Sequence, residues 1–254
     1  MPTEEDHLAR ISREREFFAE QVVAGRELSW AEATPIAPRR REMRAGRLVS
    51  GAGIRGATGR GRLVLDVGCG TGTYTLPVAR LTEATIVGID VTPETLAQGR
   101  QVVPENVRLA GADAVRLPFA DATFDAVVGN AVLHHLPLTS AIPELIRTLK
   151  PGGKLCFAEP NLVNPHLFVA LNVPGLRRRL GATPDETAFV RWPLRRTLGV
   201  LGLTDVDIRP FDFMYPGVPA GWIDAVEGLG RILEATPGVR EIAGSLLIRG
   251  QKPA

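Results

Sequence analysis

Short apolar runs alternate with helix-spaced apolar residues through the middle of the chain. The runs lie at residues 63–67, 85–89, 107–110, 126–129 and 154–158. Short runs that are mostly apolar are typical of strands that are buried on both faces of a parallel sheet. After the first run, Thr75, Val78 and Ala79 are spaced for one buried face of a helix. The alternation of strands and helices predicts an α/β fold.

The C-terminal part continues this order less regularly. Residues 203–210 alternate between apolar and polar, as a strand does, and residues 243–249 form a last apolar run. One helix is expected to begin at Trp192 and end at Gly202, and an amphipathic helix is expected over 220–235. Together with the five earlier runs this gives seven strands, and strands that alternate with helices imply a doubly wound sheet.

The N-terminal residues precede this pattern. A helix is expected from Thr3 to Gly25, because Thr3 can cap it and acidic residues follow in its first turn. Residues 28–61 are less regular and contain prolines, glycines and a basic run. The arginines of that run are Arg39, Arg40, Arg41, Arg44 and Arg47. We expect them to form a solvated helix face, and contact with an acidic substrate or a phosphate is the alternative.

Composition limits the class of protein. With 254 residues, of which 44% are hydrophobic and 23% charged, the chain can bury a sizeable core. Its net charge of +2 argues against a strongly basic nucleic-acid surface. Cys69 and Cys156 form no CxxC pair, and no residue cluster has convincing metal-ligand spacing, so neither a disulfide nor a metal site is expected. Without a membrane-spanning stretch or a signal-like N-terminus, a cytoplasmic protein is expected.

The most informative stretch is 62–74, RLVLDVGCGTGTY. Its apolar run ends in three glycines at alternate positions, Gly68, Gly70 and Gly72, and a helix pattern follows. A strand, a glycine turn and a helix bring a ligand against backbone N–H groups at the helix N-terminus. The spacing differs from the dinucleotide pattern G-x-G-x-x-G, because Asp66 lies inside a motif Asp-x-Gly-x-Gly-x-Gly. A plain tight turn in another α/β protein is the alternative.

This motif resembles the first motif of the class I methyltransferases, which use S-adenosylmethionine (SAM). Two further landmarks of that family follow in the usual order, LPF before FD over 117–125 and LKPGG at 149–153. The resemblance covers about residues 62–160. It implies a mostly parallel seven-stranded sheet with an antiparallel last strand beside the sixth. It also implies that SAM is the cofactor and that the glycine turn, with Asp66 and Thr71, contacts its methionine and ribose part.

Two strand ends supply further expected cofactor contacts. Asp90 ends the second run, some twenty residues past the glycine turn, where an acidic side chain can accept hydrogen bonds from both ribose hydroxyls. A helix cap is the alternative function of Asp90. Val91 is expected to lie against the adenine. The resemblance implies that Asp113 accepts a hydrogen bond from the adenine amine and that the backbone of Ala114 supports the ring.

Residues 130–137, NAVLHHLP, follow a central strand at the edge where open α/β sheets bind their ligands. Asn130 and Ala131 are expected near the methionine part of the cofactor. His134 and His135 are the only adjacent histidines in the chain. Because imidazole titrates near neutral pH, either could be a general base, and His135 is also a candidate cofactor contact. The alternative is that the pair is structural.

The segments outside the resemblance carry the substrate predictions. We expect an N-terminal helical lid segment at 1–61 and a methyltransferase domain at 62–254, with substrate-cap insertions near 160–192 and 211–241. The candidate substrate residues are Trp30, Asn161 and Tyr215. The pair Phe17 and Phe18 is a further lid candidate, and packing is the alternative for these aromatic residues.

These observations predict a SAM-dependent methyltransferase that modifies a small-molecule metabolite. A hydroxyl oxygen is favoured as acceptor, because hydroxyls are common acceptors and the histidine pair offers a base. The chain lacks the [Asp/Asn]-Pro-Pro-[Tyr/Phe] segment of DNA adenine methyltransferases and the Pro-Cys pair of cytosine C5 enzymes. Three alternatives stay open: C- or N-methylation, a cyclisation or rearrangement that uses SAM as a scaffold, and a SAM-binding protein without enzymatic activity. The oligomeric state is not predicted.

Overall fold

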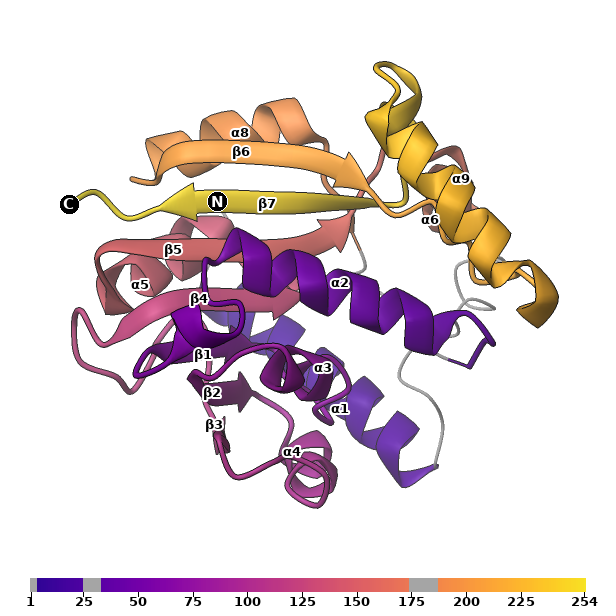
Figure 1. Cartoon of the computed structure of the whole chain (residues 1–254). Coiled ribbons are helices and arrows are strands. Elements are labelled where there is room, and N and C mark those ends of the chain that lie inside the picture. Colours follow the sequence, from indigo (N-terminus) through magenta and orange to yellow (C-terminus); the bar gives the residue numbers. More distant parts are fainter. Residues whose placement is uncertain (1–3, 25–32, 174–186) are drawn as a thin grey trace.

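The computed structural model describes residues 4–24, 33–173 and 187–254. Its centre is a seven-stranded sheet with the strand order β3-β2-β1-β4-β5-β7-β6 (Figure 1). The neighbouring strands β3, β2, β1, β4 and β5 pair in parallel. Strand β7 pairs antiparallel with both β5 and β6. The predicted doubly wound sheet, with an antiparallel last strand beside the sixth, is confirmed.

Most elements lie where the hydrophobic pattern predicts them. The strands are β1 (Leu63–Val67), β2 (Thr85–Asp90), β3 (Val107–Gly111), β4 (Phe124–Asn130), β5 (Leu149–Pro160), β6 (Thr204–Phe211) and β7 (Ser245–Gln251). The described α-helices are α1 (Glu4–Val23), α2 (Ala37–Gly51), α3 (Thr75–Arg80), α4 (Pro93–Gly99), α5 (Leu138–Thr148), α6 (Pro165–Asn172), α8 (Arg191–Val200) and α9 (Ile223–Ala235). Short 3-10 helices are η1 (Ala57–Gly59), η2 (Leu133–His135), η3 (Ala220–Trp222) and η4 (Val239–Ile242).

Both faces of the sheet are covered by helices. Val64 of β1 packs in the hydrophobic layer that contains residues of α2 and α3. Its neighbours Leu65 and Val67 pack in the opposite layer, with residues of η2, α5 and α8. Because successive side chains of a strand point to opposite faces, a strand between two such layers is apolar throughout. This explains the continuous apolar runs of the sequence.

Helix α2 carries the predicted basic helix face, but it is also part of the core. Pro38 lies in its first turn, where a proline begins a helix without losing a hydrogen bond. Its buried apolar side chains include Ala45, Leu48 and Val49. The prediction of a solvated arginine face is wrong at Arg44, which is only 5% exposed. The predicted domain boundary after residue 61 therefore assigns α2 to the N-terminal segment, although α2 packs against the strands of the sheet.

Strand β5 begins earlier than predicted. The expected turn at Pro151-Gly152-Gly153 lies within it, and Gly152 has a positive φ of 73°. The register between β4 and β5 shifts between Phe124 and Ala126. The two glycines thus serve an irregularity in the strand pairing, as glycine often does in a strand.

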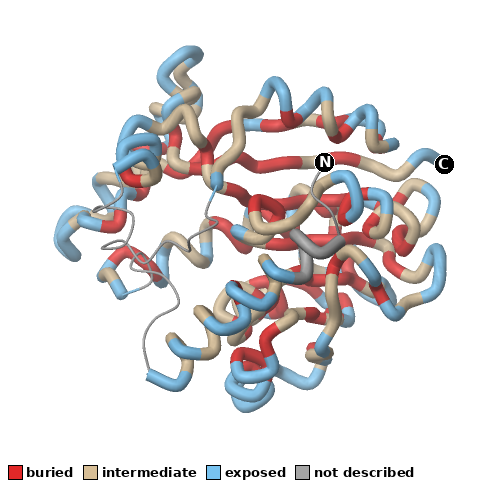
Figure 2. Tube along the Cα trace, turned by 180° about the vertical axis from the view of Figure 1, so that it is seen from behind, coloured by how far each residue is buried: buried red, intermediate tan, exposed pale blue. Residues whose placement is uncertain are grey.

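Three segments cover the carboxyl ends of the strands: α1, α6 and the connection 212–244 between β6 and β7 (Figure 1). Their helices are mostly exposed or half-buried: Ala170 is the one buried residue of α6, and Gly230 is the one buried residue of α9. Figure 2 accordingly shows burial concentrated along the sheet. The unexpected helix α6 begins at Asn164, whose side chain accepts a hydrogen bond from the Leu167 N–H.

None of the helices that the structure describes is both long and apolar enough to cross a membrane. The predicted substrate residue Trp30 lies outside the described residues.

Candidate functional site

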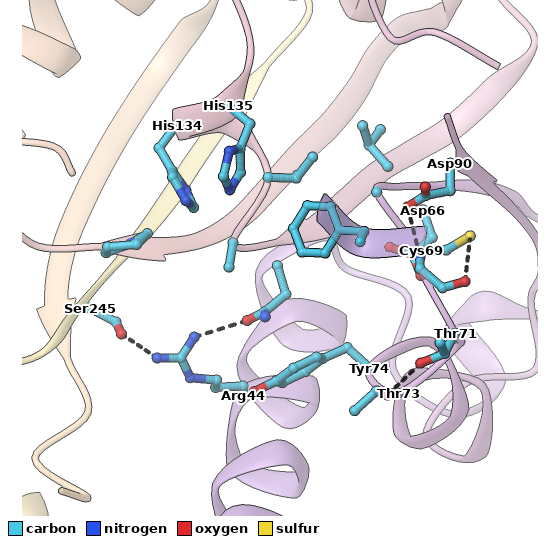
Figure 3. A pocket seen from close by; sticks show the side chains of 18 of the residues that line it. Arg44, Asp66, Cys69, Thr71, Thr73, Tyr74, Asp90, His134, His135 and Ser245 are labelled. Atoms are coloured by element: carbon cyan, nitrogen blue, oxygen red, sulfur yellow. Dashed lines mark hydrogen bonds between the residues drawn. The ribbon is translucent and has the colours of Figure 1, made fainter. Parts of the chain in front are cut away.

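A cavity of about 600 Å³ lies at the carboxyl ends of β1, β2, β4 and β5 (Figure 3). The glycine turn after β1, the residues that follow β2 and β4, and Pro160 at the end of β5 line it. Residues of α1, α2 and α6 and residues 212–216 complete the wall. This is the sheet edge at which open α/β folds bind their ligands.

The glycine turn needs its glycines. Gly68, Gly70 and Gly72 have positive φ angles of 67°, 53° and 82°, a conformation that side chains disfavour. A Cβ atom on Gly68 would also lie 2.5 Å from Cγ2 of Val132. The turn therefore lies in close contact with the segment after β4, and the two together form one side of the cavity.

Asp90 ends β2 and is anchored in the cavity wall by backbone N–H groups. Its Oδ2 accepts a hydrogen bond from Gly70 N at 2.9 Å, and its Oδ1 accepts one from Thr92 N at 2.8 Å. Burial raises the pKa of Asp90 although these two hydrogen bonds oppose the shift. Thr95 Oγ1 also lies 3.4 Å from Oδ1, whereas Oδ2 keeps a second lone pair with which Asp90 can accept a hydrogen bond from a ligand hydroxyl.

Asp66, inside β1, places a second carboxyl group in the wall. It is 6% exposed, and its Oδ2 accepts a hydrogen bond from Thr75 Oγ1 at 2.6 Å. Burial raises the pKa of Asp66 to about 7, a shift that the Thr75 hydrogen bond opposes and the charge of Asp90 increases. A ligand that brings positive charge to this end of the cavity would favour the ionised form of both groups.

Asn130 ends β4, and Ala131 follows it in the segment that contacts the glycine turn. The Asn130 Oδ1 accepts a hydrogen bond from Nη1 of Arg44 at 3.0 Å, which ties β4 to α2 (Figure 3). Ala131 has a positive φ of 53°, and its N–H donates to the carbonyl of Ala158 at 2.8 Å. This kink directs the chain from the end of β4 into η2 along the cavity wall.

His134 is bound by a carboxylate inside the protein. Its Nδ1 lies 2.7 Å from Oε2 of Glu159, and both side chains are at most 1% exposed. Glu159 also accepts hydrogen bonds from the N–H groups of Val132 and Leu133, both at 2.9 Å. Glu159 therefore holds the whole η2 turn, and with it the position of both histidines.

His135 pairs with a carboxylate from a distant part of the chain. Its Nδ1 lies 2.9 Å from Oε1 of Glu14 on α1, and the edge of Phe18 faces its ring at 6.3 Å between centroids. Arg10 of the same helix donates to the carbonyl of His134 at 2.9 Å. The two imidazole rings lie 4.0 Å apart and project into the space shown in Figure 3.

Most of the residues predicted from the sequence meet in this one cavity. Its lining includes Asp66, Gly68, Gly70, Thr71, Asp90, Val91, Ala114, Asn130, Ala131, His134, His135 and Tyr215. Gly72 and Asp113 are not among the lining residues. The N–H of Gly72 closes the turn onto Cys69, and Asp113 Oδ1 accepts a hydrogen bond from Val115 N at 3.0 Å. The predicted roles of these residues in binding stay predictions.

Asn161 and Tyr215, two candidate substrate residues, lie in different surroundings. Asn161 is 1% exposed, and its side-chain amide donates to the carbonyls of Glu241 and Ala243. The structure thus places it as an anchor for η4 and outside the cavity lining. Tyr215 lines the cavity, and its hydroxyl lies 3.1 Å from Nε2 of His166.

Several polar residues of the wall were not expected from the sequence. Glu14, Glu159, His166 and Asp212 all line the cavity or hold residues that do. Glu159 follows a predicted strand, so its position at the ligand edge could have been expected. The others depend on contacts between distant segments, for which a single sequence gives no signal. Within the described part of the chain, no group of three or more His, Cys, Asp or Glu could hold a metal ion.

The similarity to known proteins lies in the part of the chain that contains the glycine turn, Asp90 and the histidine pair. A family model described as "Methyltransferase domain" matches residues 65–157. The O-methyltransferase cnsE of Penicillium expansum is 32% identical over 174 residues, 65% of this chain and 62% of that protein. The 2-methyl-6-phytyl-1,4-hydroquinone methyltransferase of Synechocystis sp. is 29% identical over 204 residues, 74% of this chain and 64% of that protein. The matches thus span slightly less than two thirds of the length of these relatives.

Solved structures share the fold at lower identity. The complex between the Haloferax volcanii Trm112 methyltransferase activator and the putative methyltransferase matches with a TM-score of 0.65 and 18% identity, over 93% of this chain and 98% of the matched chain. The [4+2]-cyclase SpnF matches with a TM-score of 0.56 and 24% identity, over 84% and 81%. At these identities the likeness shows a common fold.

Proposed function

We propose that this chain, which matches a methyltransferase domain model over residues 65–157, transfers the methyl group of SAM to a hydroxyl oxygen of a small molecule. The observation that carries the proposal is the joining of the glycine turn and the Asp90 carboxylate in one cavity wall, with a histidine pair opposite. The cavity of about 600 Å³ has the size of a small-molecule site.

The cofactor has an assigned place in this proposal. The residues at the end of β2, Asp90 and Val91, with Ala114, would hold the adenosine part, since Asp90 can accept from ribose hydroxyls. The glycine turn and the Asn130-Ala131 kink would hold the methionine part. SAM supplies an electrophilic methyl group on a positively charged sulfur, and the raised pKa of Asp66, about 7, fits a wall that gains from such a charge.

The residues of this chain would contribute mainly position and proton removal. Holding two reactants in line can lower the barrier by ~7–11 kcal/mol in well-oriented cases. His135 is the proposed general base for the acceptor hydroxyl. Glu14, whose Oε1 lies 2.9 Å from Nδ1, would accept a hydrogen bond from Nδ1–H and so favour the tautomer whose Nε2 is basic. His134 has its Nδ1 committed to the buried Glu159 and would position the η2 turn.

The proposed function is tested by calorimetric titration of the purified chain with SAM and with S-adenosylhomocysteine (SAH). One site per chain with roughly micromolar Kd is expected for both. Phenols and hydroquinones are then screened as acceptors with SAM carrying a labelled methyl group, and label on a product oxygen is expected. Absence of binding to either nucleoside contradicts the proposal, and label on carbon or nitrogen contradicts the choice of oxygen.

Replacing His135 by alanine is expected to lower kcat by ~10²–10⁴-fold, the usual contribution of a general base. The affinity for SAH should stay nearly the same, because the proposed role concerns the acceptor proton. Glu14→Gln should give a smaller loss of kcat, since the amide oxygen can still accept from Nδ1–H but carries no charge.

The control is Glu16→Gln on the exposed side of the same helix, which should leave kcat unchanged. An equal loss of SAH affinity and kcat in His135→Ala would identify His135 as a binding residue and not as a base.

A further inference from the structure

Exposed hydrophobic side chains gather at the end of the molecule where the parallel strands have their carboxyl ends. In the described part of the chain thirteen large hydrophobic residues are exposed, and nine of them lie in only two segments. These segments are α6 with the residue that follows it, and the connection 212–244 (Figure 1). Single exposed hydrophobic residues are ordinary on any protein, whereas a concentration at one end indicates a binding surface.

Helix α6 is apolar on both of its sides. Leu167 and Leu171, one helical turn apart, line the cavity, and Ala170 beside them is buried. The exposed side of the helix and the residue after it carry Phe168, Val169 and Val173. A helix that is hydrophobic all round is normally buried all round. The outward side of α6 is therefore suited to contact with an apolar partner.

The connection 212–244 continues this surface. The side-chain amide of Asn164 donates to the carbonyl of Ile242 at 2.7 Å, and the hydroxyl of Tyr215 lies 3.1 Å from Nε2 of His166. The connection is thus joined to the start of α6 near both of its own ends. Its exposed large hydrophobic residues are Tyr215, Trp222, Leu229, Ile232, Val239 and Ile242.

Both tryptophans that the structure describes are exposed, Trp192 by 56% and Trp222 by 66%. Tryptophan is usually well buried in a folded protein. Trp192 belongs to the same end of the molecule, because Arg191 beside it pairs with Glu241 of η4 at 2.8 Å. Indoles are favoured at a membrane–water interface, where the ring meets apolar chains and the N–H meets water and headgroups. The two indoles therefore suit a lipid surface.

The charged groups of these segments suit an anionic lipid surface. Three acidic residues of the connection already pair with arginines at 2.5–2.8 Å: Glu227 with Arg39, Glu234 with Arg47 and Glu241 with Arg191. Arg195 and Arg196, one turn further along α8, are exposed and form no ion pair in the described part of the chain. Asp224 of α9 is the one exposed acidic residue of the connection. Positive charge thus predominates among the groups that are free to meet a partner.

We propose that this docking surface, formed by α6, the connection 212–244 and the start of α8, binds an anionic lipid bilayer. Its apolar residues enter the headgroup region, and Arg195 and Arg196 lie against lipid phosphates. A second copy of the chain is a poorer partner, because it would bring the same arginines to the same interface. The inference goes beyond the proposed methyl transfer and does not depend on it. Docking places α6, one wall of the cavity, directly at the lipid.

The test is cosedimentation of the full chain with vesicles of phosphatidylcholine alone and with vesicles that also contain phosphatidylglycerol. We expect binding to the mixed vesicles that is roughly tenfold tighter than to phosphatidylcholine and that weakens with salt. The double variant Phe168→Gln/Val169→Gln should bind the mixed vesicles roughly tenfold more weakly, because it loses apolar burial. Arg195→Gln/Arg196→Gln should lose most of the preference for the anionic vesicles.

The matched controls are Val102→Gln and Arg80→Gln, which replace exposed residues outside the docking surface and should bind vesicles as the wild type does. Absence of binding by the wild-type chain overturns the proposal, and so does undiminished binding by Phe168→Gln/Val169→Gln. Sedimentation equilibrium tests the other occupant: self-association of the wild type that this double variant abolishes would assign the surface to a second copy and overturn the proposal.

A second measurement does not depend on the stability of the double variants. Lipids brominated in their acyl chains should quench the tryptophan emission of the wild-type chain, and Trp222→Phe should remove part of the quenched emission. Emission that brominated vesicles leave unquenched overturns the proposal. Thermal unfolding shows whether each variant is folded.

Discussion

Replacing Asp212 by asparagine is expected to lower the free energy of unfolding by about 3–5 kcal/mol, the cost of leaving buried charge without its partner. The side chain of Asp212 is fully buried, and the substitution removes the carboxylate with which both Arg40 and Arg44 pair. The backbone should not contribute, because Asp212 has a positive φ of 77°, which asparagine also tolerates. Urea denaturation at neutral pH measures the effect.

The effect of Asp212→Asn should depend on pH. Burial alone would raise the pKa of Asp212, but the charges of Arg40 and Arg44 outweigh burial and lower it. An acid whose folded pKa is depressed contributes stability above its unfolded pKa of 3.8, and that stability is lost as pH falls through the folded pKa. The difference between wild type and variant should therefore be constant from pH 5 upward and shrink below about pH 4.

Asp207→Asn provides the matched control. Asp207 also pairs with an arginine, Arg249, but its side chain is 40% exposed, so the expected loss is below about 1 kcal/mol. A loss of similar size for Asp212→Asn would mean that the buried cluster contributes no more than a surface ion pair.

Replacing Asp90 by alanine should weaken SAM binding by about 1–3 kcal/mol, the usual effect of removing a charged hydrogen-bond partner. The same loss is expected for SAH and for 5′-methylthioadenosine, because all three carry the ribose that Asp90 is proposed to bind. Calorimetric titration measures these affinities, and unchanged affinity would refute the assignment of Asp90.

Two further variants distinguish ribose binding from damage to the glycine turn. Asp90→Asn retains an oxygen that can accept from Gly70 N, so the turn should persist while ribose binding weakens. Thr95→Val removes a hydroxyl that lies 3.4 Å from Asp90 Oδ1, and should change SAM affinity little. If Thr95→Val and Asp90→Ala lose affinity equally, the loss reflects disturbance of the strand end.

The fold was predictable because its signal is local. Residues 63–67 are apolar except for Asp66 because β1 is buried on both faces, and the glycines that follow are required by positive φ and by the approach of Val132. Both features are visible in consecutive residues. Strand order and the antiparallel last strand came from the family resemblance, which those same residues carry.

The contacts of the segments that cover the site were not predictable, because they join residues that are far apart in the sequence. Glu14 meets His135 across 121 positions, and Arg44 meets Asp212 across 168. Arg44 looked like one member of a solvated basic run, because its helical spacing from Arg40 is equally consistent with a face turned to water or to a cavity. Asn161 follows a strand end like many ligand residues, yet its amide donates to backbone carbonyls 80 and 82 positions away.

The pairing of Phe211 with Ser245 has a consequence for how acceptor specificity can change. These residues are register partners in adjacent strands, so the connection 212–244 leaves and re-enters the sheet at neighbouring points. A change in its length should alter the free energy of folding only slightly, because the entropy of loop closure grows slowly with loop length and the two strands already fix the ends of the loop. We therefore expect that the connection can be replaced by another segment without a change in the pairing of β6 and β7. Grafting a different segment between the same two strands, with Asp212 retained, would exchange the cavity-lining residues 213–216 and leave the sequence of the glycine turn and Asp90 unchanged.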